Sequence, residues 1–353
     1  MLDFITEHES SWDKLKAETR PIFIYGMGDG AVKIMTAMRE FKIPLAGIFA
    51  SDEFVRGHSF EGYRVHKLSE IEEAVDDFVI VLAFAAGFQA LVDKIQQLAK
   101  KHTLIVPDVP VTGGGLFTYP YCEEHAEEIE RVYNMLADNQ SRTVYANIIN
   151  FKISGNIDYL TTVTTPKSEI YKEIIRPTTN EIFVDLGAYN GDTIRELLEF
   201  SRGKFHRIVA MEPDKKNFKK LQKFIGHSPA IDTYNCVAWC VDTEIPFSTK
   251  AGRQSAVGEG ALMPARSVDS ILDGERATII KMDVEGAERE AIWGASRTIS
   301  RFGPMLMISL YHRNEDIFEL PILISRLNPK YKLYIRHQLY IPAWETNLYA
   351  VCE

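Results

Sequence analysis

The feature that most constrains this chain is an apolar segment at residues 181–186 that runs into a glycine-containing turn at residues 187–193. A second apolar run, residues 207–211, follows and ends at Glu212. A buried strand, a glycine turn, a helix and a second strand that ends in an acid form the layout of a nucleotide-binding unit. Glycines let the backbone approach a ligand closely, and the first amides of the helix point to the same crevice. The sequence therefore predicts an open α/β sheet with a cofactor site at this turn.

The charges of this turn indicate which cofactor it binds. Asp185 and Asp192 would repel the pyrophosphate of a dinucleotide, but they suit a ligand that carries a sulfonium and an ammonium group. Glu212 is placed to accept hydrogen bonds from both hydroxyls of a ribose. We therefore expect S-adenosylmethionine here. The alternative interpretation of the segment is an ordinary strand, turn and capped helix.

Composition sets the broad class of the protein. The chain has 353 residues, of which 46% are apolar and 25% charged, as in a globular protein of two domains. A net charge of -9 without a dense lysine or arginine run argues against nucleic acid and anionic membranes as partners. Because no signal-peptide pattern and no bilayer-length apolar run occurs, we expect a cytoplasmic protein without membrane insertion. The four cysteines lack paired spacing, which favours reduced thiols.

Strand-to-helix alternation occurs twice along the chain. The sequence predicts a Rossmann-like α/β domain at 1–110, a helical connection at 111–165 and a second, larger α/β domain at 166–353. In the first domain we expect strands at 21–25, 45–49, 78–84 and 103–106, and helices at 30–41 and 87–101. In the connection, apolar residues with helical spacing predict an amphipathic helix at 123–138.

The second domain combines parallel and antiparallel strands. Parallel strands are expected at 182–186, 208–211, 231–236, 278–282 and 305–310. Two further apolar strands, 331–336 and 347–352, are separated by a short loop and must therefore pair antiparallel. Residues 244–249 and the glycine-rich loop 252–260 predict a β insertion over the crevice, which could close over a substrate. This layout is known from methyltransferases of the seven-stranded class.

Five motifs in this half of the chain resemble the FkbM family of S-adenosylmethionine-dependent methyltransferases. They are VDLGAYNGDT at 184–193, MEPD at 211–214, NCVAW at 235–239, SVDSI at 267–271 and IKMDVEGAE at 280–288. The resemblance implies the class I methyltransferase fold, with a seven-stranded sheet and an antiparallel last strand. It also implies methyl transfer to a hydroxyl, in many members of a sugar, a polysaccharide or a polyketide. It does not identify the acceptor.

The predicted cofactor contacts lie at the carboxyl ends of neighbouring strands, where ligands bind in open α/β sheets. By the resemblance, Val237 and Ala238 lie beside Trp239 where the family places the adenine. Trp239 is equally compatible with a place in the core. The full predicted set is Asp185, Gly187, Ala188, Tyr189, Asn190, Gly191, Asp192, Thr193, Glu212, Val237, Ala238 and Asp283.

The predicted catalytic residues are Asp283, Glu285 and His312, which follow the fourth and fifth strands. Methyl transfer from a sulfonium is an in-line displacement, so catalysis needs positioning and a base for the hydroxyl. We predict that His312 is this base, and a surface histidine without chemistry is the alternative. A divalent metal held by these three residues is a third hypothesis. Glu288 is expected to stabilise the start of a helix.

The amino-terminal domain has its own glycine turn, residues 26–31, with the spacing Gly-x-Gly-x-x-Ala and with Asp52 beyond the second strand. Asp29 inside the turn would repel a pyrophosphate, which favours a ligand-free docking domain over a site for NAD or a nucleotide sugar. The sequence thus predicts an O-methyltransferase with a sugar, glycan or related hydroxyl acceptor. An NAD-dependent sugar-modifying oxidoreductase and a non-catalytic nucleotide-binding protein are the alternatives. Assembly into a homo-oligomer is left open.

Overall fold

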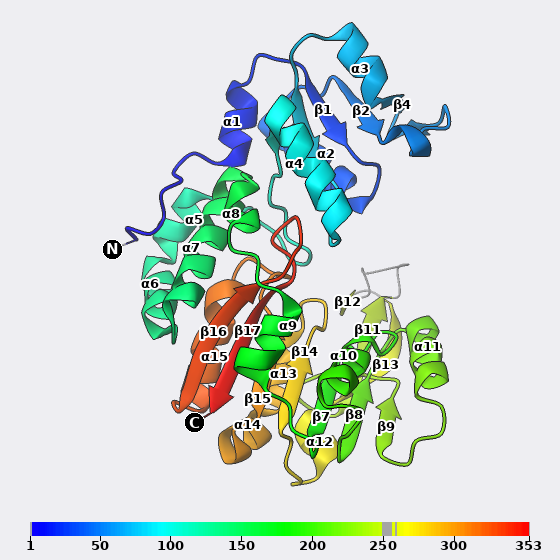
Figure 1. Cartoon of the computed structure of the whole chain (residues 1–353), viewed down its shortest axis with the longest axis vertical. Coiled ribbons are helices and arrows are strands. Elements are labelled where there is room, and N and C mark those ends of the chain that lie inside the picture. Colours follow the sequence, from blue (N-terminus) through cyan, green and yellow to red (C-terminus); the bar gives the residue numbers. More distant parts are fainter. Residues whose placement is uncertain (1, 249–255, 258–259, 353) are drawn as a thin grey trace.

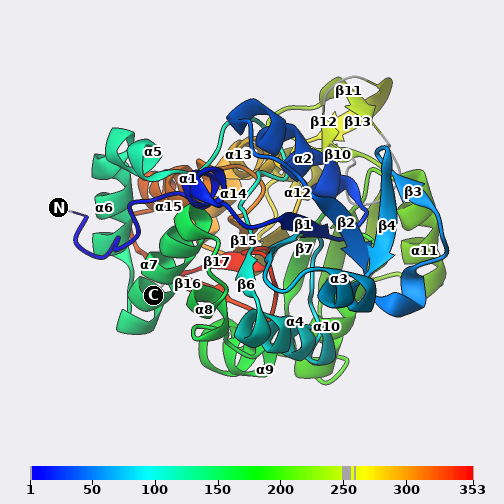
Figure 2. The same ribbon diagram turned by 90° about the horizontal axis from the view of Figure 1, so that it is seen from above.

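The computed structural model describes residues 2–248, 256–257 and 260–352. Two α/β units lie one above the other along the long axis, and the helices of residues 119–161, α5 to α8, lie beside them (Figure 1). Seen from above, the strands of the amino-terminal sheet overlie those of the carboxyl-terminal sheet (Figure 2). The predicted domain boundaries at 110 and 165 stay a prediction. Within the described ranges, no helix has both the length and the apolar character needed to cross a membrane.

The amino-terminal sheet has six strands in the order β3-β4-β2-β1-β5-β6, and its pairs are parallel except β3 with β4. Its central strands are buried on both sides, because α1 and α2 cover one face while α3 and α4 cover the other. The strands are β1 (Ile22–Tyr25), β2 (Gly47–Ala50), β3 (Ser59–Phe60), β4 (Tyr63–Lys67), β5 (Val79–Leu82) and β6 (Thr103–Ile105). The helices are α1 (Ser11–Ala17), α2 (Asp29–Phe41), η1 (Asp52–Phe54), α3 (Leu68–Ala74) and α4 (Gln89–Lys101).

The predicted strands and helices of this unit are confirmed, but α1, β3, β4 and α3 were not predicted. Val65 is the one fully buried residue of β4, because this strand lies near the edge of the sheet. A strand with one buried residue lacks the apolar run that identifies an interior strand. The sequence of β4 therefore resembles that of a surface segment.

The helices that connect the two sheets along the chain differ from the single helix predicted at 123–138. The helix is interrupted at His125, so that two helices, α5 and α6, form in its place, and α7 follows. Helix α7 was missed because ten of its sixteen residues are buried, so it has no clear polar face. Its Asn150 side chain accepts the amides of Thr6 and Glu7, which fastens the first residues of the chain. The bounds are α5 (Tyr119–Glu124), α6 (Ala126–Met135), α7 (Asn139–Ser154) and α8 (Asp158–Thr161).

The carboxyl-terminal sheet has seven strands in the order β16-β17-β15-β14-β7-β8-β9. As predicted from the short loop, β17 is antiparallel to β16, and it is also antiparallel to β15; the other pairs are parallel. The chain runs from β7 outward to β9 and returns to β14 on the other side of β7. Ligands of open α/β sheets bind at such a switch point. The strands are β7 (Ile182–Leu186), β8 (Arg207–Met211), β9 (Ile231–Tyr234), β14 (Ile279–Met282), β15 (Met305–Ser309), β16 (Tyr331–His337) and β17 (Thr346–Cys352).

Helices cover both faces of this sheet, which explains why its strands are almost entirely apolar. One face packs against α9 (Lys167–Ile170), the π-helix η2 (Tyr171–Ile175), α10 (Asp192–Phe200) and α11 (Lys215–Ile225). The other face packs against α12 (Val268–Leu272), α13 (Glu288–Gly294), α14 (Ser296–Phe302) and α15 (Asp316–Leu327).

A small sheet, in the order β10-β13-β11-β12, follows β9. The predicted β insertion is thus present, whereas the strand predicted at 231–236 ends at Tyr234. The glycine-rich loop predicted at 252–260 lies mostly outside the described residues. The bounds are β10 (Val237–Ala238), β11 (Thr243–Ser248), β12 (Ala256–Val257) and β13 (Ala261–Arg266).

Candidate active site

One cleft of about 440 Å³ lies at the carboxyl edge of the seven-stranded sheet and reaches the amino-terminal unit. Its walls are the loops that follow β7, β8, β14 and β15, the β16–β17 connection, the start of α2 and residues 109–111. Most of the predicted site residues line it, namely Gly187, Tyr189, Asp192, Thr193, Glu212, Val237, Ala238, Asp283, Glu285 and His312. Asp185, Ala188, Asn190 and Gly191 do not line the cleft.

The turn after β7 is shaped by its glycines, but for a reason other than the one expected. Gly187 has a φ of 77°, and a Cβ at this position would overlap the carbonyl oxygen of Asp283. A Cβ at Gly191 would meet the ring of Phe224. These two glycines are therefore needed where the turn crosses the β14 loop and packs on α11. Tyr189, with a φ of 47°, is left-handed without being glycine.

Glu212 is held to this turn by hydrogen bonds. Its carboxylate accepts the amide of Tyr189 and the amide of Asp214, each at 2.8 Å. Burial raises the pKa of Glu212 to about 7, although both amides act in the opposite direction. Each carboxylate oxygen keeps a second acceptor position. The side chain thus offers two fixed acceptors at the cleft wall, as a ribose diol requires.

Lys281 is a charged residue of the site to which the sequence reasoning gave no role. Its Nζ lies 3.5 Å from Oδ1 of Asp185 and 3.8 Å from Oδ2 of Asp283, and it donates to the carbonyl of Gly187 at 3.1 Å. Burial lowers the pKa of Lys281, but the two carboxylates raise it by more than burial lowers it. The lysine therefore stays charged. A lysine in an otherwise apolar parallel strand was the available signal, because a buried charge needs a partner.

Asp185 therefore has a different place from the one expected. It is fully buried, and burial raises the pKa of its carboxyl to about 6. Its charge faces Lys281 beneath the cleft rather than the cleft itself. The rim is consequently less acidic than its carboxylates alone suggest, so the charge argument for a cationic ligand is weaker than the sequence indicated.

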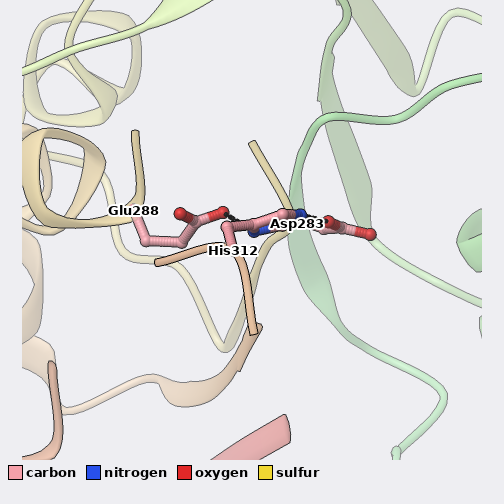
Figure 3. Close-up of side chains that lie close together, drawn as sticks. All are labelled: Asp283, Glu288 and His312. Atoms are coloured by element: carbon pink, nitrogen blue, oxygen red, sulfur yellow. Dashed lines mark ion pairs between the residues drawn. The ribbon is translucent and has the colours of Figure 1, made fainter. Parts of the chain in front are cut away.

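His312 lies between two carboxylates, as Figure 3 shows for Glu288 and Asp283. Its Nδ1 is 2.9 Å from Oε1 of Glu288, a contact without hydrogen-bond geometry and hence an ion pair. Its Nε2 is 3.4 Å from Oδ1 of Asp283 and 3.6 Å from Oε2 of Glu285. Glu288 also accepts the amide of Val284 at 2.8 Å, in keeping with its expected structural role. His312 is 1% exposed, so the alternative of a surface histidine is wrong.

The surroundings of His312 determine its protonation. Burial lowers its pKa, but Glu288, Asp283 and Glu285 raise it more, to about 10. At neutral pH the imidazole is therefore charged and has no lone pair with which to accept a proton. In this charged state His312 cannot act as the predicted base. A metal held by Asp283, Glu285 and His312 stays a prediction. Carboxylates face both ring nitrogens, as a buried imidazolium requires.

The small sheet contributes one apolar side of the cleft. Val237 and Ala238 of β10 are buried and line it, together with Phe247. Trp239 does not line it and instead packs on the core of the small sheet. The predicted contact of Val237 and Ala238 with an adenine stays a prediction.

The amino-terminal unit reaches the cleft through the start of α2. Asp29, Gly30 and Lys33 line it, and Lys33 donates to the carbonyls of Pro110 and Val111 at 3.2 and 2.8 Å. Asp52, the acid expected near a ribose, does not line the cleft and instead accepts the Ser69 hydroxyl at 3.2 Å. The amino-terminal turn thus contributes to the shared cleft through its helix rather than through the expected acid.

The crystal structure of the methyltransferase FkbM from Methylobacillus flagellatus is similar over 99% of this chain and 95% of its own, with a TM-score of 0.77 and 22% identity, which shows the fold. Aeropyrum pernix fibrillarin with bound S-adenosylmethionine is 13% identical over 52% of this chain and 73% of its own, with a TM-score of 0.34. An rRNA methylase from Streptococcus thermophilus is 12% identical over 53% and 93%, also with a TM-score of 0.34. No curated protein matches the sequence significantly.

The family comparison covers the part of the chain that supplies most of the cleft. The family model of the methyltransferase FkbM domain matches residues 185–340. This stretch begins at the last residues of β7 and extends into the β16–β17 connection. Residues 185–340 therefore match the methyltransferase FkbM domain, within a chain that has a methyltransferase-like α/β fold.

Proposed function

We propose that this protein transfers a methyl group from S-adenosylmethionine to a hydroxyl of a sugar, glycan or related natural product. The observation that carries the proposal is the carboxylate of Glu212, which is fixed by two backbone amides at the switch point of an FkbM methyltransferase domain. When bound, S-adenosylmethionine supplies a methyl group on a positively charged sulfur.

The residues of the cleft suit this cofactor. Glu212 would hold the ribose hydroxyls, since its oxygens keep acceptor positions. Val237 and Ala238 would contact the adenine with an apolar surface. Asp192, which is exposed at the start of α10, would attract the ammonium group. Lys281 would balance the charge of Asp185 and Asp283 beneath the site.

The carboxylates beside His312 would bind the acceptor hydroxyl and take its proton. Asp283 and Glu285 line the cleft, and burial raises the pKa of Asp283 while Lys281 and His312 lower it below its usual range. Asp283 is therefore ionised and can accept a hydrogen bond from the acceptor hydroxyl. The transfer would break the sulfur–methyl bond as the oxygen–methyl bond forms, and the Asp283 carboxylate would take the proton that the hydroxyl releases. The charged His312 would hold Asp283 and Glu285 in position, which is a different role from the predicted base.

A calorimetric titration of the purified protein tests the cofactor. S-adenosylmethionine and S-adenosylhomocysteine should both release or absorb heat on binding, whereas NAD should not. Binding of NAD alone would instead support the oxidoreductase, for which the orientation of Asp52 gives little support. Absence of heat with all three ligands would contradict the methyltransferase proposal.

Replacement of His312 tests the assignment of the acceptor side. His312→Ala should abolish methyl transfer and leave the affinity for S-adenosylhomocysteine nearly unchanged, because His312 contacts the acids of the site rather than Glu212. Transfer is measured as S-adenosylhomocysteine released in the presence of a sugar acceptor. Unchanged turnover would remove His312 from the mechanism, and bound but never consumed cofactor in the wild type would support a non-catalytic protein.

A further inference from the structure

The β16–β17 connection, residues 338–345, forms one wall of the cleft to which no part has yet been assigned. We propose that this segment, here named the arch, is the binding wall for a neutral, ring-shaped polyhydroxyl acceptor, and that the amino-terminal unit holds it in position. The inference rests on the proposed function, because it assigns the acceptor side of the same cleft. It goes further by naming the side chains that recognise the acceptor and the part of the chain that orients them.

Aromatic rings and hydrogen-bond acceptors lie together on the arch. Tyr340 and Trp344 line the cleft, with ring centroids 6.0 Å apart and ring planes inclined by 28°. Gln338 and Glu345 of the arch line the same cleft, as does Asn347 at the start of β17. An apolar surface with a few fixed polar groups is the usual composition of a small-molecule site. The arch sequence QLYIPAWE contains no lysine or arginine, which favours a neutral ligand over a phosphate.

Gln338 indicates what kind of group the wall needs. Its Nε2 donates to the Tyr349 hydroxyl at 3.1 Å, but its buried Oε1 has no hydrogen-bond partner in the described part of the chain. A buried acceptor without a donor is costly, so a ligand hydroxyl at this position would be stabilising. A sugar ring offers several hydroxyl donors and an apolar C–H face for the aromatic rings.

The arch is fixed by its own hydrogen bonds. His337 at its start is completely buried, and its ring nitrogens contact the Thr346 hydroxyl at 3.0 Å and the Tyr340 carbonyl at 3.1 Å. Thr346 in turn donates to the Ala343 carbonyl at 2.7 Å. A wall that is already ordered loses less entropy on binding than a flexible loop does.

The amino-terminal unit clamps the arch from outside. Ala86 and Ile341 exchange two backbone hydrogen bonds, of 2.7 and 2.9 Å, in an isolated β-bridge. Next to it, a Cβ on Gly87 would lie 2.5 Å from Cε2 of Tyr340. The Tyr340 ring can therefore occupy its place on the wall because residue 87 is a glycine. This contact gives the amino-terminal unit a direct influence on the acceptor side of the cleft.

Saturation-transfer difference NMR with simple methyl glycosides tests the wall. Methyl α-D-glucopyranoside and methyl α-D-mannopyranoside are titrated in the presence of saturating S-adenosylhomocysteine, with cyclohexane-methanol as a non-sugar comparison. We expect contacts to the sugar ring protons in the wild type. Trp344→Ala should weaken the apparent affinity about tenfold, by loss of one aromatic contact. Trp344→Phe, which keeps an aromatic ring, should recover most of it.

Gly87→Ala tests the clamp without touching the cleft. Its methyl group must displace the Tyr340 ring, so glycoside binding should weaken severalfold while the protein stays folded. Gly114→Ala is the matched control, since a Cβ at that exposed glycine meets no atom within 4 Å. Both variants should bind S-adenosylhomocysteine as the wild type does.

The outcomes separate this inference from the proposed function. Unchanged glycoside binding in Trp344→Ala and Gly87→Ala would contradict the proposed binding wall. A wild type that binds S-adenosylhomocysteine but neither glycoside would contradict it as well. Loss of S-adenosylhomocysteine affinity in a folded Trp344→Phe protein would also overturn it, because the arch would then belong to the cofactor side. A wild type without affinity for S-adenosylhomocysteine would contradict the proposed function itself.

Discussion

The β1–α2 turn and the β7–α10 turn both place glycines between a buried strand and a helix. Only in the β7–α10 turn does the acid at the end of the neighbouring strand bond to the turn. Glu212 accepts the amide of Tyr189 and lines the cleft. Asp52, its counterpart in the amino-terminal unit, bonds to Ser69 instead. The same local pattern is therefore joined to an acid only in the second turn, where we propose that the cofactor binds.

Gly187 and Gly28 differ in what requires them, although the other glycines of the amino-terminal turn are packed closely. A Cβ at Gly26 would lie 2.9 Å from the Phe84 ring, and one at Gly30 would lie 2.7 Å from the Ala83 carbonyl oxygen. Gly187 is needed because the β14 loop crosses directly beside it. Gly28, at the start of α2, has an ordinary φ of -119° and free space around its absent side chain. A glycine spacing is thus compatible with two distinct causes, close packing of backbones and open access to a helix end.

Gly187→Ala should have the largest effect of the changes that probe this difference. The new methyl group overlaps the Asp283 carbonyl in a left-handed backbone conformation, so the free energy of unfolding should fall by at least about 3 kcal/mol. Urea unfolding followed by circular dichroism measures it. A variant as stable as the wild type would mean that the turn can move away from the β14 loop.

Glu212→Ala paired with Asp52→Ala tests the two acids directly. Loss of the Glu212 carboxylate should weaken S-adenosylhomocysteine binding about 100-fold, or about 2.7 kcal/mol, because two hydrogen bonds to the ribose are lost. Asp52→Ala should leave the affinity unchanged, since Asp52 does not line the cleft. Calorimetric titration of both variants gives the comparison. Equal losses in the two variants would contradict the different roles of the turns.

The pH dependence of stability should also depend on Glu212. Its pKa is raised from 4.5 to about 7 by burial, so the folded state holds a proton that the unfolded state has released between these values. The stability linked to this group is fully present below pH 4.5 and is lost as the pH rises through 7. Between about pH 4.5 and 7 the wild type should lose on the order of 2 kcal/mol more than Glu212→Gln. Urea unfolding across this range checks it, and parallel curves would refute it.

Gly28→Ser should have the smallest effect and the opposite sign. Serine at the first position before a helix can accept a hydrogen bond from the helix amides, and no neighbour obstructs it. The melting temperature should rise slightly, equivalent to about 0.5 kcal/mol. A clear loss of stability would show that the space beside Gly28 cannot hold a side chain.

Much of the carboxyl-terminal sheet could be predicted from the sequence, because interior parallel strands are continuous apolar runs that end in polar residues. Strand β4 and helix α7 could not, since one has a single buried residue and the other is buried nearly all round. Among the site residues, Glu212 lines the cleft, whereas Asp185 was expected in the cleft and lies beneath it.

The sequence by itself determined the order of the interior strands, the two glycine turns and the acids at the strand ends, because these depend on neighbours along the chain. The tertiary structure alone decided that Lys281 neutralises Asp185, that His312 is buried and charged, and that Gly87 packs on Tyr340. Each of these depends on groups far apart in the sequence, whose distance and burial set their charge and their access to a ligand.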